Sequence, residues 1–273
     1  MSVSTSAMSA CQLLRRSLEK NGLAGTWSKG LRHLSASIRW SLYRRAVAQS
    51  RLDAKGMFTL IYRKRIWSEC DTPGASISGY GSSLAYTAGL RLQLADILRA
   101  LGTRTLFDAP CGDFNWMRLV EFPPDMTYIG ADIVDALIRE NLRRHPAARR
   151  QFRVFDIARD AFPQADLWFC RDCLFHLSYR DIHAALGGFV RSGIPYLLTT
   201  THDNHAGAFA NHDIRTGDWR RIDLCAEPFG LPQQVEHAIV DFVPPEPPRK
   251  MCLWTRAQVA DSLPRLASAI DSR

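Results

Sequence analysis

The chain has 273 residues, of which 46% are hydrophobic and 23% charged, the composition of a globular protein. No run of about 18 consecutive apolar residues occurs, so a transmembrane helix is not expected. The net charge of +8 arises within residues 1–51, where nine lysines and arginines stand against one acid, Glu19. Because the remaining chain is neutral overall, it lacks the basic catalytic surface of a nucleic-acid enzyme, and no nucleic-acid partner is expected.

The first residues predict a basic helical extension over 1–56 that precedes a single domain over 57–273. Apolar residues recur there at helical spacing, at Leu31, Leu34, Ile38 and Leu42. The alternatives are a helix that contacts a membrane surface or a partner protein, and an organellar transit peptide. No continuous apolar segment of a secretory signal is present. The seven cysteines are odd in number and scattered, which favours a reducing, cytoplasmic location over a disulfide framework.

Residues 57–83 combine an aromatic stretch with a glycine-containing loop over 78–83, which suits a tight turn. A helix is expected over 84–101. Beyond it, strands and helices alternate. The strands are expected at 103–109, 126–133, 150–157, 166–170 and 195–201, and the helices at 115–120, 134–145 and 178–191.

The last third holds two strand-like runs, 235–243 and 250–255, joined by a proline-rich loop. With no helix between them, they should pair antiparallel at the edge of the sheet. The sequence therefore predicts an α/β fold: a doubly wound, mostly parallel, seven-stranded sheet whose last strand is antiparallel.

Three carboxylates follow three consecutive predicted strands. Asp108 closes the first, Asp132 the second and Asp156 the third. Ligands of open parallel sheets bind at the carboxyl ends of the strands, so these acids favour a ligand rich in hydrogen-bond donors and positive charge. We expect Asp132 to accept from ribose hydroxyls and Asp156 to face an adenine amino group, with Asp108 and Asp113 near an ammonium and a sulfonium.

The loop after the first strand argues against a dinucleotide. It reads Asp108-Ala-Pro-Cys-Gly-Asp113, with one glycine and an acid where a pyrophosphate would lie. A pyrophosphate needs several glycines and a helix N-terminus without competing negative charge. S-adenosylmethionine (SAM) carries no phosphate and tolerates this loop.

These segments resemble the motifs of class I, Rossmann-like, SAM-dependent methyltransferases, and in particular a largely uncharacterised bacterial-type group with the same Asp-Ala-Pro-Cys-Gly-Asp loop. Residues 108–117 resemble the first motif, 128–133 the second, 155–157 the segment that faces adenine, and 166–177 the fourth motif beside the methyl-transfer site. The resemblance covers about residues 57–256. It implies SAM as the cofactor, bound by Asp108, Pro110, Gly112, Asp113, Trp116, Asp132, Ile133, Asp156, Ile157, Arg171, Gly79 and Ser82.

His176 is a candidate general base, because a neutral imidazole accepts a proton near neutral pH; the alternative is a histidine that shapes its loop. Asp172 is the second candidate base, or else it orients the methionine end of the cofactor. Arg171 is a candidate partner for the cofactor carboxylate. Cys170 and Cys173 with His176 give no complete zinc ligand set, so no metal is expected.

The sequence thus predicts methyl transfer from SAM to an oxygen or nitrogen of a small molecule or a glycan. Alignment and proximity would supply most of the catalysis, because the methyl group is already activated. Two alternatives stay open: a non-catalytic module that keeps the fold, and a nicotinamide-dependent oxidoreductase, which the acidic single-glycine loop disfavours.

Overall fold

The structure is a computed structural model that describes residues 52–68, 75–244 and 246–272. They belong to the second of two units into which the chain divides, Arg51–Arg273. The predicted basic extension therefore lies, up to residue 51, outside the described residues.

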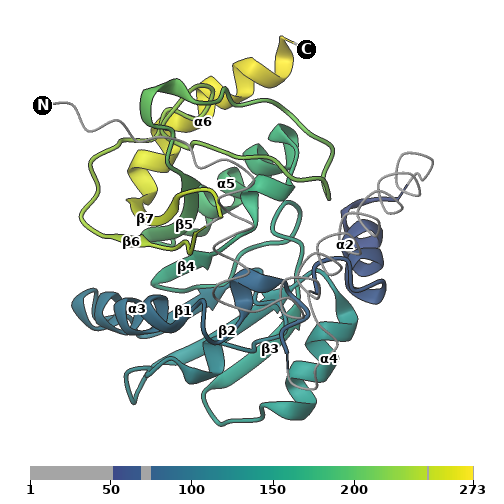
Figure 1. Ribbon diagram of the computed structural model, residues 1–273. Helices are drawn as coiled ribbons and strands as arrows, with labels where there is room; N and C mark the ends of the chain where they lie inside the picture. Colours follow the sequence, from purple (N-terminus) through teal and green to yellow (C-terminus); the bar gives the residue numbers. More distant parts are fainter. Residues whose placement is uncertain (1–51, 69–74, 245, 273) are drawn as a thin grey trace, which may run out of the picture. The chain divides into compact units, whose positions relative to one another are not determined.

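A seven-stranded sheet forms the centre of the described part of the chain (Figure 1). Its spatial order is β3-β2-β1-β4-β5-β7-β6, and β1 to β5 run parallel to one another. β7 is antiparallel to both β5 and β6. The predicted mostly parallel sheet with an antiparallel last strand is confirmed. The strands are β1 (Thr105–Asp108), β2 (Thr127–Asp132), β3 (Arg150–Val154), β4 (Leu167–Cys170), β5 (Tyr196–His202), β6 (Ala238–Val240) and β7 (Arg249–Thr255).

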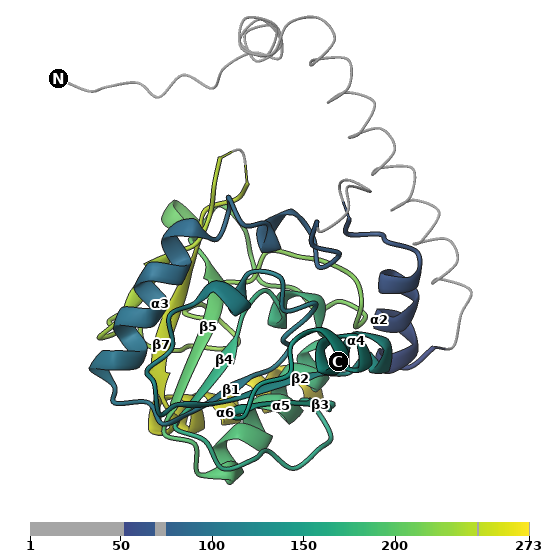
Figure 2. The same cartoon turned by 90° about the horizontal axis from the view of Figure 1, so that it is seen from below.

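Alternate side chains of each strand enter two different hydrophobic cores, because successive residues of a strand point to opposite faces. On β1, Phe107 packs with the core that contains α5 (Tyr179–Ser192) and α6 (Arg256–Asp271). Its neighbour Leu106 packs with the core that contains α3 (Ala88–Ala100). Figure 2 shows α5 and α6 together on one side of the sheet and α3 on the other, so the domain has three layers.

The predicted helices over 84–101, 134–145 and 178–191 are confirmed as α3, α4 (Asp135–Arg144) and α5. α5 begins where its sequence indicates, because the Ser178 hydroxyl accepts a hydrogen bond from the backbone N–H of Asp181. It ends at Gly193, whose φ of 82° is the left-handed conformation that stops helices at glycine.

The predicted helix over 115–120 is wrong. The chain forms only a single 3-10 turn there, η2 (Met117–Leu119). Two residues just before it, Gly112 and Phe114, have φ values of 55°, outside the right-handed helical region. Pro123 and Pro124 follow closely, so too few residues remain for an α-helix.

Two helices lie outside the predictions. α2 (Ala54–Arg63) is capped by Asp53, whose carboxylate accepts from the backbone N–H of Gly56. α6 begins with a capping box, in which the Thr255 hydroxyl and the Gln258 side chain satisfy each other's backbone N–H groups. α2 lies beside α4 in both views (Figures 1 and 2), and Lys55 forms an ion pair of 2.9 Å with Asp135.

Residues 203–237 connect β5 to β6 through irregular chain that contains one 3-10 turn, η4 (His205–Gly207). This connection buries apolar side chains in the core that contains α5 and α6, and its backbone bonds to that of His202 at the end of β5 and of His176 after β4. The buried side chains are Ile222, Leu224, Phe229 and Leu231.

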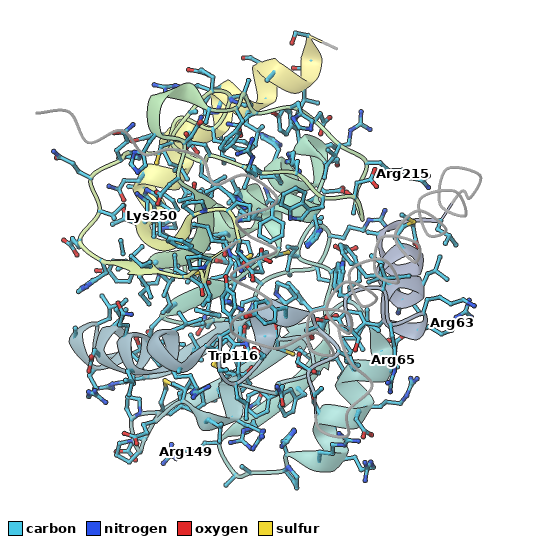
Figure 3. All side chains as sticks on the ribbon, in the orientation of Figure 1. Arg63, Arg65, Trp116, Arg149, Arg215 and Lys250 are labelled. Carbon is cyan, nitrogen blue, oxygen red and sulfur yellow. The ribbon has the colours of Figure 1, made fainter. Side chains whose placement is uncertain are left out.

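Within the described ranges, none of the helices combines the length and apolar character needed to span a membrane. Of the exposed arginines labelled in Figure 3, Arg63 and Arg215 lie on the right-hand side of the domain and Arg149 at its lower left.

Candidate active site at the carboxyl ends of the strands

Asp132 is the last residue of β2 and is 4% exposed. One carboxylate oxygen accepts a hydrogen bond from the backbone N–H of Val134 at 3.0 Å, and the other accepts from that of Gly112 at 3.1 Å. Burial raises the pKa of Asp132 to about 6, against the opposing effect of these hydrogen bonds. Each oxygen keeps a further lone pair, which is the arrangement that a pair of hydroxyl donors requires.

Asp108 ends the neighbouring strand β1, in register with Gly130 of β2. Its carboxylate accepts a hydrogen bond of 2.5 Å from the hydroxyl of Tyr128. Burial, with the nearby charge of Asp132, raises the pKa of Asp108 to about 8, against the lowering effect of the Tyr128 hydrogen bond. Asp108 and Asp132 therefore lie at one edge of the sheet and influence each other, as predicted from their positions.

Asp156 lies two residues beyond the end of β3, farther along the same edge. Its carboxylate accepts from the backbone N–H of Ala158 at 2.9 Å. Burial raises its pKa, and the charges that act on it come from Arg159, Asp160 and Asp181. The backbone N–H of the preceding residue, Phe155, donates to the carbonyl of Asp132 at 3.0 Å, so Asp156 lies next to the end of β2. The next residue, Ile157, packs against the core that contains α5.

The loop that follows β1 is held by backbone and side-chain contacts rather than by a helix. The Ala109–Pro110 peptide bond is cis. The backbone N–H of Cys111 donates to the carbonyl of Ala131 at 2.8 Å, and the Asn141 amide of α4 donates to the carbonyl of Gly112 at 2.9 Å. These contacts fix the Gly112 N–H toward the carboxylate of Asp132.

Replacing Gly112 with alanine is expected to destabilise the protein more than replacing Gly102 with alanine. Both glycines have positive φ values, 55° and 59°, so each alanine bears the cost of that conformation, about 1–2 kcal/mol. A Cβ at position 112 would also lie 2.6 Å from the Ser78 hydroxyl oxygen, whereas one at 102 has nothing within 4 Å. Urea unfolding measures the difference, and equal losses for the two variants would contradict the importance of the Ser78 contact.

Residues 76–82 pack against this loop through Asp113. The Asp113 carboxylate accepts from the backbone N–H of Ile77 at 2.8 Å and from the Ser76 hydroxyl at 3.2 Å. The Asn115 amide donates to the carbonyl of Ser82 at 3.2 Å. Gly79 has a φ of 103°, which allows the turn before the 3-10 turn η1 (Tyr80–Ser82). The predicted residues Gly79, Ser82, Gly112 and Asp113 are therefore neighbours.

Arg171 and Asp172 follow β4. Arg171 is buried, and its guanidinium binds the carboxylate of Asp241 through two hydrogen bonds, of 2.7 and 3.0 Å. It also donates to the carbonyl of Gly81 at 2.9 Å. Burial opposes the ionisation of Asp172, but the guanidinium groups of Arg171 and Arg249 outweigh it and hold the pKa of Asp172 below its usual value.

Arg249 is a site residue that the sequence analysis missed. It begins β7, and it pairs in register with His202 at the end of β5. An antiparallel strand starts at the edge where parallel strands end, so the first residue of β7 reaches the same edge as Asp172. The signal that predicts this position is the proline-rich loop directly before Arg249, once β7 is known to pair with β5.

His176 lies in the 3-10 turn η3 (Leu174–His176). Its Nδ1 lies 2.8 Å from the carbonyl oxygen of Asp218, which only accepts, so Nδ1 carries the proton and Nε2 carries the lone pair. Burial lowers the pKa of His176 to about 4. The imidazole is therefore neutral at neutral pH. The negative charge of Asp172 acts on the imidazole and raises its pKa, but by less than burial lowers it.

Aromatic rings surround His176. The ring centroids of Trp67 and His176 are 4.9 Å apart, and those of Phe175 and His176 are 4.6 Å apart. Trp67 also contacts Tyr62 of α2, whose hydroxyl lies 3.0 Å from the Ser78 hydroxyl. The aromatic stretch after α2 therefore lies against the predicted site rather than in a separate part of the domain.

Two other predicted site residues occupy different surroundings. Trp116 is 7% exposed and packs in the core that contains α3, with the Arg171 guanidinium 5.4 Å from its ring centroid. Figure 3 places Trp116 in the interior of the domain. Ile133 directly follows Asp132 and is partly buried.

Cys170 and Cys173 are buried free thiols, and His176 Nδ1 is engaged with a backbone carbonyl. Among the described residues, no group of three or more histidine, cysteine, aspartate or glutamate side chains could hold a metal ion.

Comparison with solved structures places this arrangement among known folds. The chain is similar to magnesium protoporphyrin IX methyltransferase (ChlM) from Synechocystis PCC 6803 with bound SAM, at 11% identity and a TM-score of 0.51, over 76% of this chain and 99% of that one. It is also similar to PigF with S-adenosylhomocysteine (SAH), at 11% identity and a TM-score of 0.53, over 82% and 69% of the chains. No family model and no curated protein matches the sequence. These likenesses confirm the predicted class I methyltransferase fold.

Proposed function

We propose that the protein is a SAM-dependent methyltransferase that acts on an oxygen or nitrogen of a small molecule or a glycan. The observation that carries the proposal is the buried carboxylate of Asp132 at the end of β2, anchored by two backbone N–H groups. A carboxylate held in this way is suited to accept hydrogen bonds from two adjacent ribose hydroxyls. Asp156, farther along the edge, is the proposed acceptor for the adenine amino group.

The donor set of the loop fits SAM better than a pyrophosphate-containing cofactor. Gly112 points its N–H at Asp132, and Asp113 places a negative charge on the loop, bonded to the backbone N–H of Ile77. A phosphate at this position would meet negative charge and would find these N–H groups already occupied. An adenosyl sulfonium is positively charged, so the same residues attract it.

When bound, SAM supplies a methyl group on a positively charged sulfur, which is already a reactive centre. The chain's own contribution is to align the acceptor and to remove its proton. His176 is the proposed base for a hydroxyl acceptor, because its Nδ1–H is held by the carbonyl of Asp218 and its Nε2 keeps the lone pair. The ionised Asp172 would stabilise the positive charge that the imidazole gains.

The proposal is tested by isothermal titration calorimetry of the full chain with SAH and with NAD. We expect SAH to bind and NAD not to bind. Transfer of a labelled methyl group from SAM to the small-molecule and glycan fractions of a cell extract then tests catalysis. His176→Asn is the informative variant, because the asparagine amide can still donate to the Asp218 carbonyl but offers no base. Absence of SAH binding, or binding without any labelled product, would contradict the proposal.

A further inference from the structure

Among the described residues, the ion pairs that the Arg249 guanidinium forms at the edge of the sheet are long. Its Nε lies 3.3 Å from one carboxylate oxygen of Asp172, and its guanidinium lies 3.3 Å from the other. The contact with Glu246 is 3.6 Å. Arg249 is 6% exposed, and its buried Nε has no hydrogen-bond partner among the described residues. A buried guanidinium N–H without a partner is costly, so this group is poised to bind an oxygen ligand.

Arg171, the other arginine at this edge, forms short hydrogen bonds through its guanidinium. Its Nε and one terminal nitrogen donate to the two oxygens of Asp241, and that nitrogen also donates to Gly81. Its remaining terminal nitrogen lies 3.4 Å from Asp172. Arg171 therefore has only this one terminal nitrogen outside its short bonds, and it could bind a carboxylate with two nitrogens only by breaking a bond to Asp241 or Gly81. Arg249 has no short side-chain bond to break.

The pair formed by Asp172 and Arg249 lies where the amino-acid end of a bound cofactor would lie. If Asp132 on β2 holds the ribose and the adenine lies toward β3, the other end of the cofactor would extend across β1 toward β4 and the loop at Gly81. A Cβ on Gly81 would lie 3.1 Å from a terminal nitrogen of Arg249 and 3.2 Å from an oxygen of Asp172. The Asp172 side chain is 24% exposed, so its carboxylate is accessible to a ligand, with the buried Arg249 guanidinium directly beside it.

The two charges match an α-amino acid. Asp172 and Arg249 present one negative and one positive group side by side, held about 3.3 Å apart rather than in a short ion pair. An α-amino acid presents an ammonium and a carboxylate at similar spacing, so it satisfies both groups without adding net charge.

Building on the proposed function, we propose that Arg249 binds the carboxylate and Asp172 binds the ammonium of the cofactor's amino-acid end. Arg249 then has the role that the sequence predicts for Arg171. Arg171 and Asp241 instead position the loop at Gly81, through the bond to its carbonyl.

The test compares two ligands by calorimetry on the full chain: SAH, and 5′-methylthioadenosine, which has the same adenosyl thioether without the amino-acid end. Arg249→Gln is expected to weaken SAH binding by about 10- to 100-fold, the value of a charge-assisted hydrogen bond, and to leave the affinity for 5′-methylthioadenosine nearly unchanged. Arg249→Lys keeps the charge but loses the planar fork, so its SAH affinity should be intermediate.

Arg221→Gln is the matched control. Arg221 is exposed, acts electrostatically on His202 as Arg249 does, and lies outside the proposed pair, so both affinities should stay at the wild-type value. An unchanged SAH affinity in Arg249→Gln, or an equal loss for both ligands, would overturn the inference. If the wild-type chain bound 5′-methylthioadenosine and bound SAH no more tightly than that, the inference about Arg249 and Asp172 would fail while the proposed function would stand. If it bound neither, the proposed function would fail with it.

Discussion

Replacing Asp241 with alanine should lower the free energy of unfolding by about 3–5 kcal/mol. Asp241 follows β6, is 3% exposed, and bonds through both carboxylate oxygens to the buried guanidinium of Arg171. Its removal leaves a positive charge in the interior with Asp172 as its remaining acidic contact, at 3.4 Å. Urea unfolding followed by circular dichroism measures the loss.

Two further variants separate charge pairing from general damage. Asp203→Ala removes a carboxylate from a partly exposed ion pair with Lys250, and it should cost at most about 1 kcal/mol. The double variant Arg171→Met/Asp241→Leu removes both buried charges together and should recover much of the stability lost by Asp241→Ala. If Asp241→Ala lowered the free energy of unfolding as little as Asp203→Ala does, the buried charge of Arg171 would not depend on Asp241.

Replacing Asp132 with asparagine should weaken SAH binding by about 100-fold. The substitution keeps the size of the side chain but removes the negative charge and one acceptor oxygen, and each charge-assisted hydrogen bond is worth about 1.5–3 kcal/mol. Calorimetry measures the change. Glu140→Gln removes a carboxylate from α4, after the same strand but on the surface, and it should leave the affinity unchanged.

The pH dependence of SAH binding gives a second measurement on the same residue. Burial raises the pKa of Asp132 to about 6, so the carboxylate is ionised above that pH and protonated below it. Because the ionised form accepts from both hydroxyls, affinity should be full above pH 6 and fall by up to tenfold per unit below it. This step should be absent in Asp132→Asn. A wild-type affinity that rises as the pH falls would contradict the assignment.

Much of the fold follows from local sequence signals. The apolar runs that became β1 to β5 are short, bounded by polar residues and separated by helical patterns, so their order predicts a parallel sheet. Ser178 and Gly193 mark both ends of α5. The pair Thr255 and Gln258, which caps α6, is an equally visible signal that the sequence analysis did not use. The wrong helix over 115–120 has a different cause, because positive φ values before it and prolines after it outweigh its apolar spacing.

The candidate site was partly predictable for a topological reason. Asp108 and Asp132 end adjacent parallel strands, so the sequence places them at one edge without further information. The position of Arg249 depends on which strand β7 joins and in which direction, and this is a long-range property. The contact between Trp67 and His176 likewise joins segments more than 100 residues apart, which no local pattern indicates.

The spatial order β5-β7-β6 constrains the sequence of events during synthesis. β6 leaves the ribosome before β7, but it has no sheet neighbour until β7 is present to pair with β5 on one side and β6 on the other. A nascent chain that ends before Arg249 therefore exposes the edge of β5 and the unpaired β6, both of which are open to non-native association. Chaperone dependence of such truncated chains is the expected consequence.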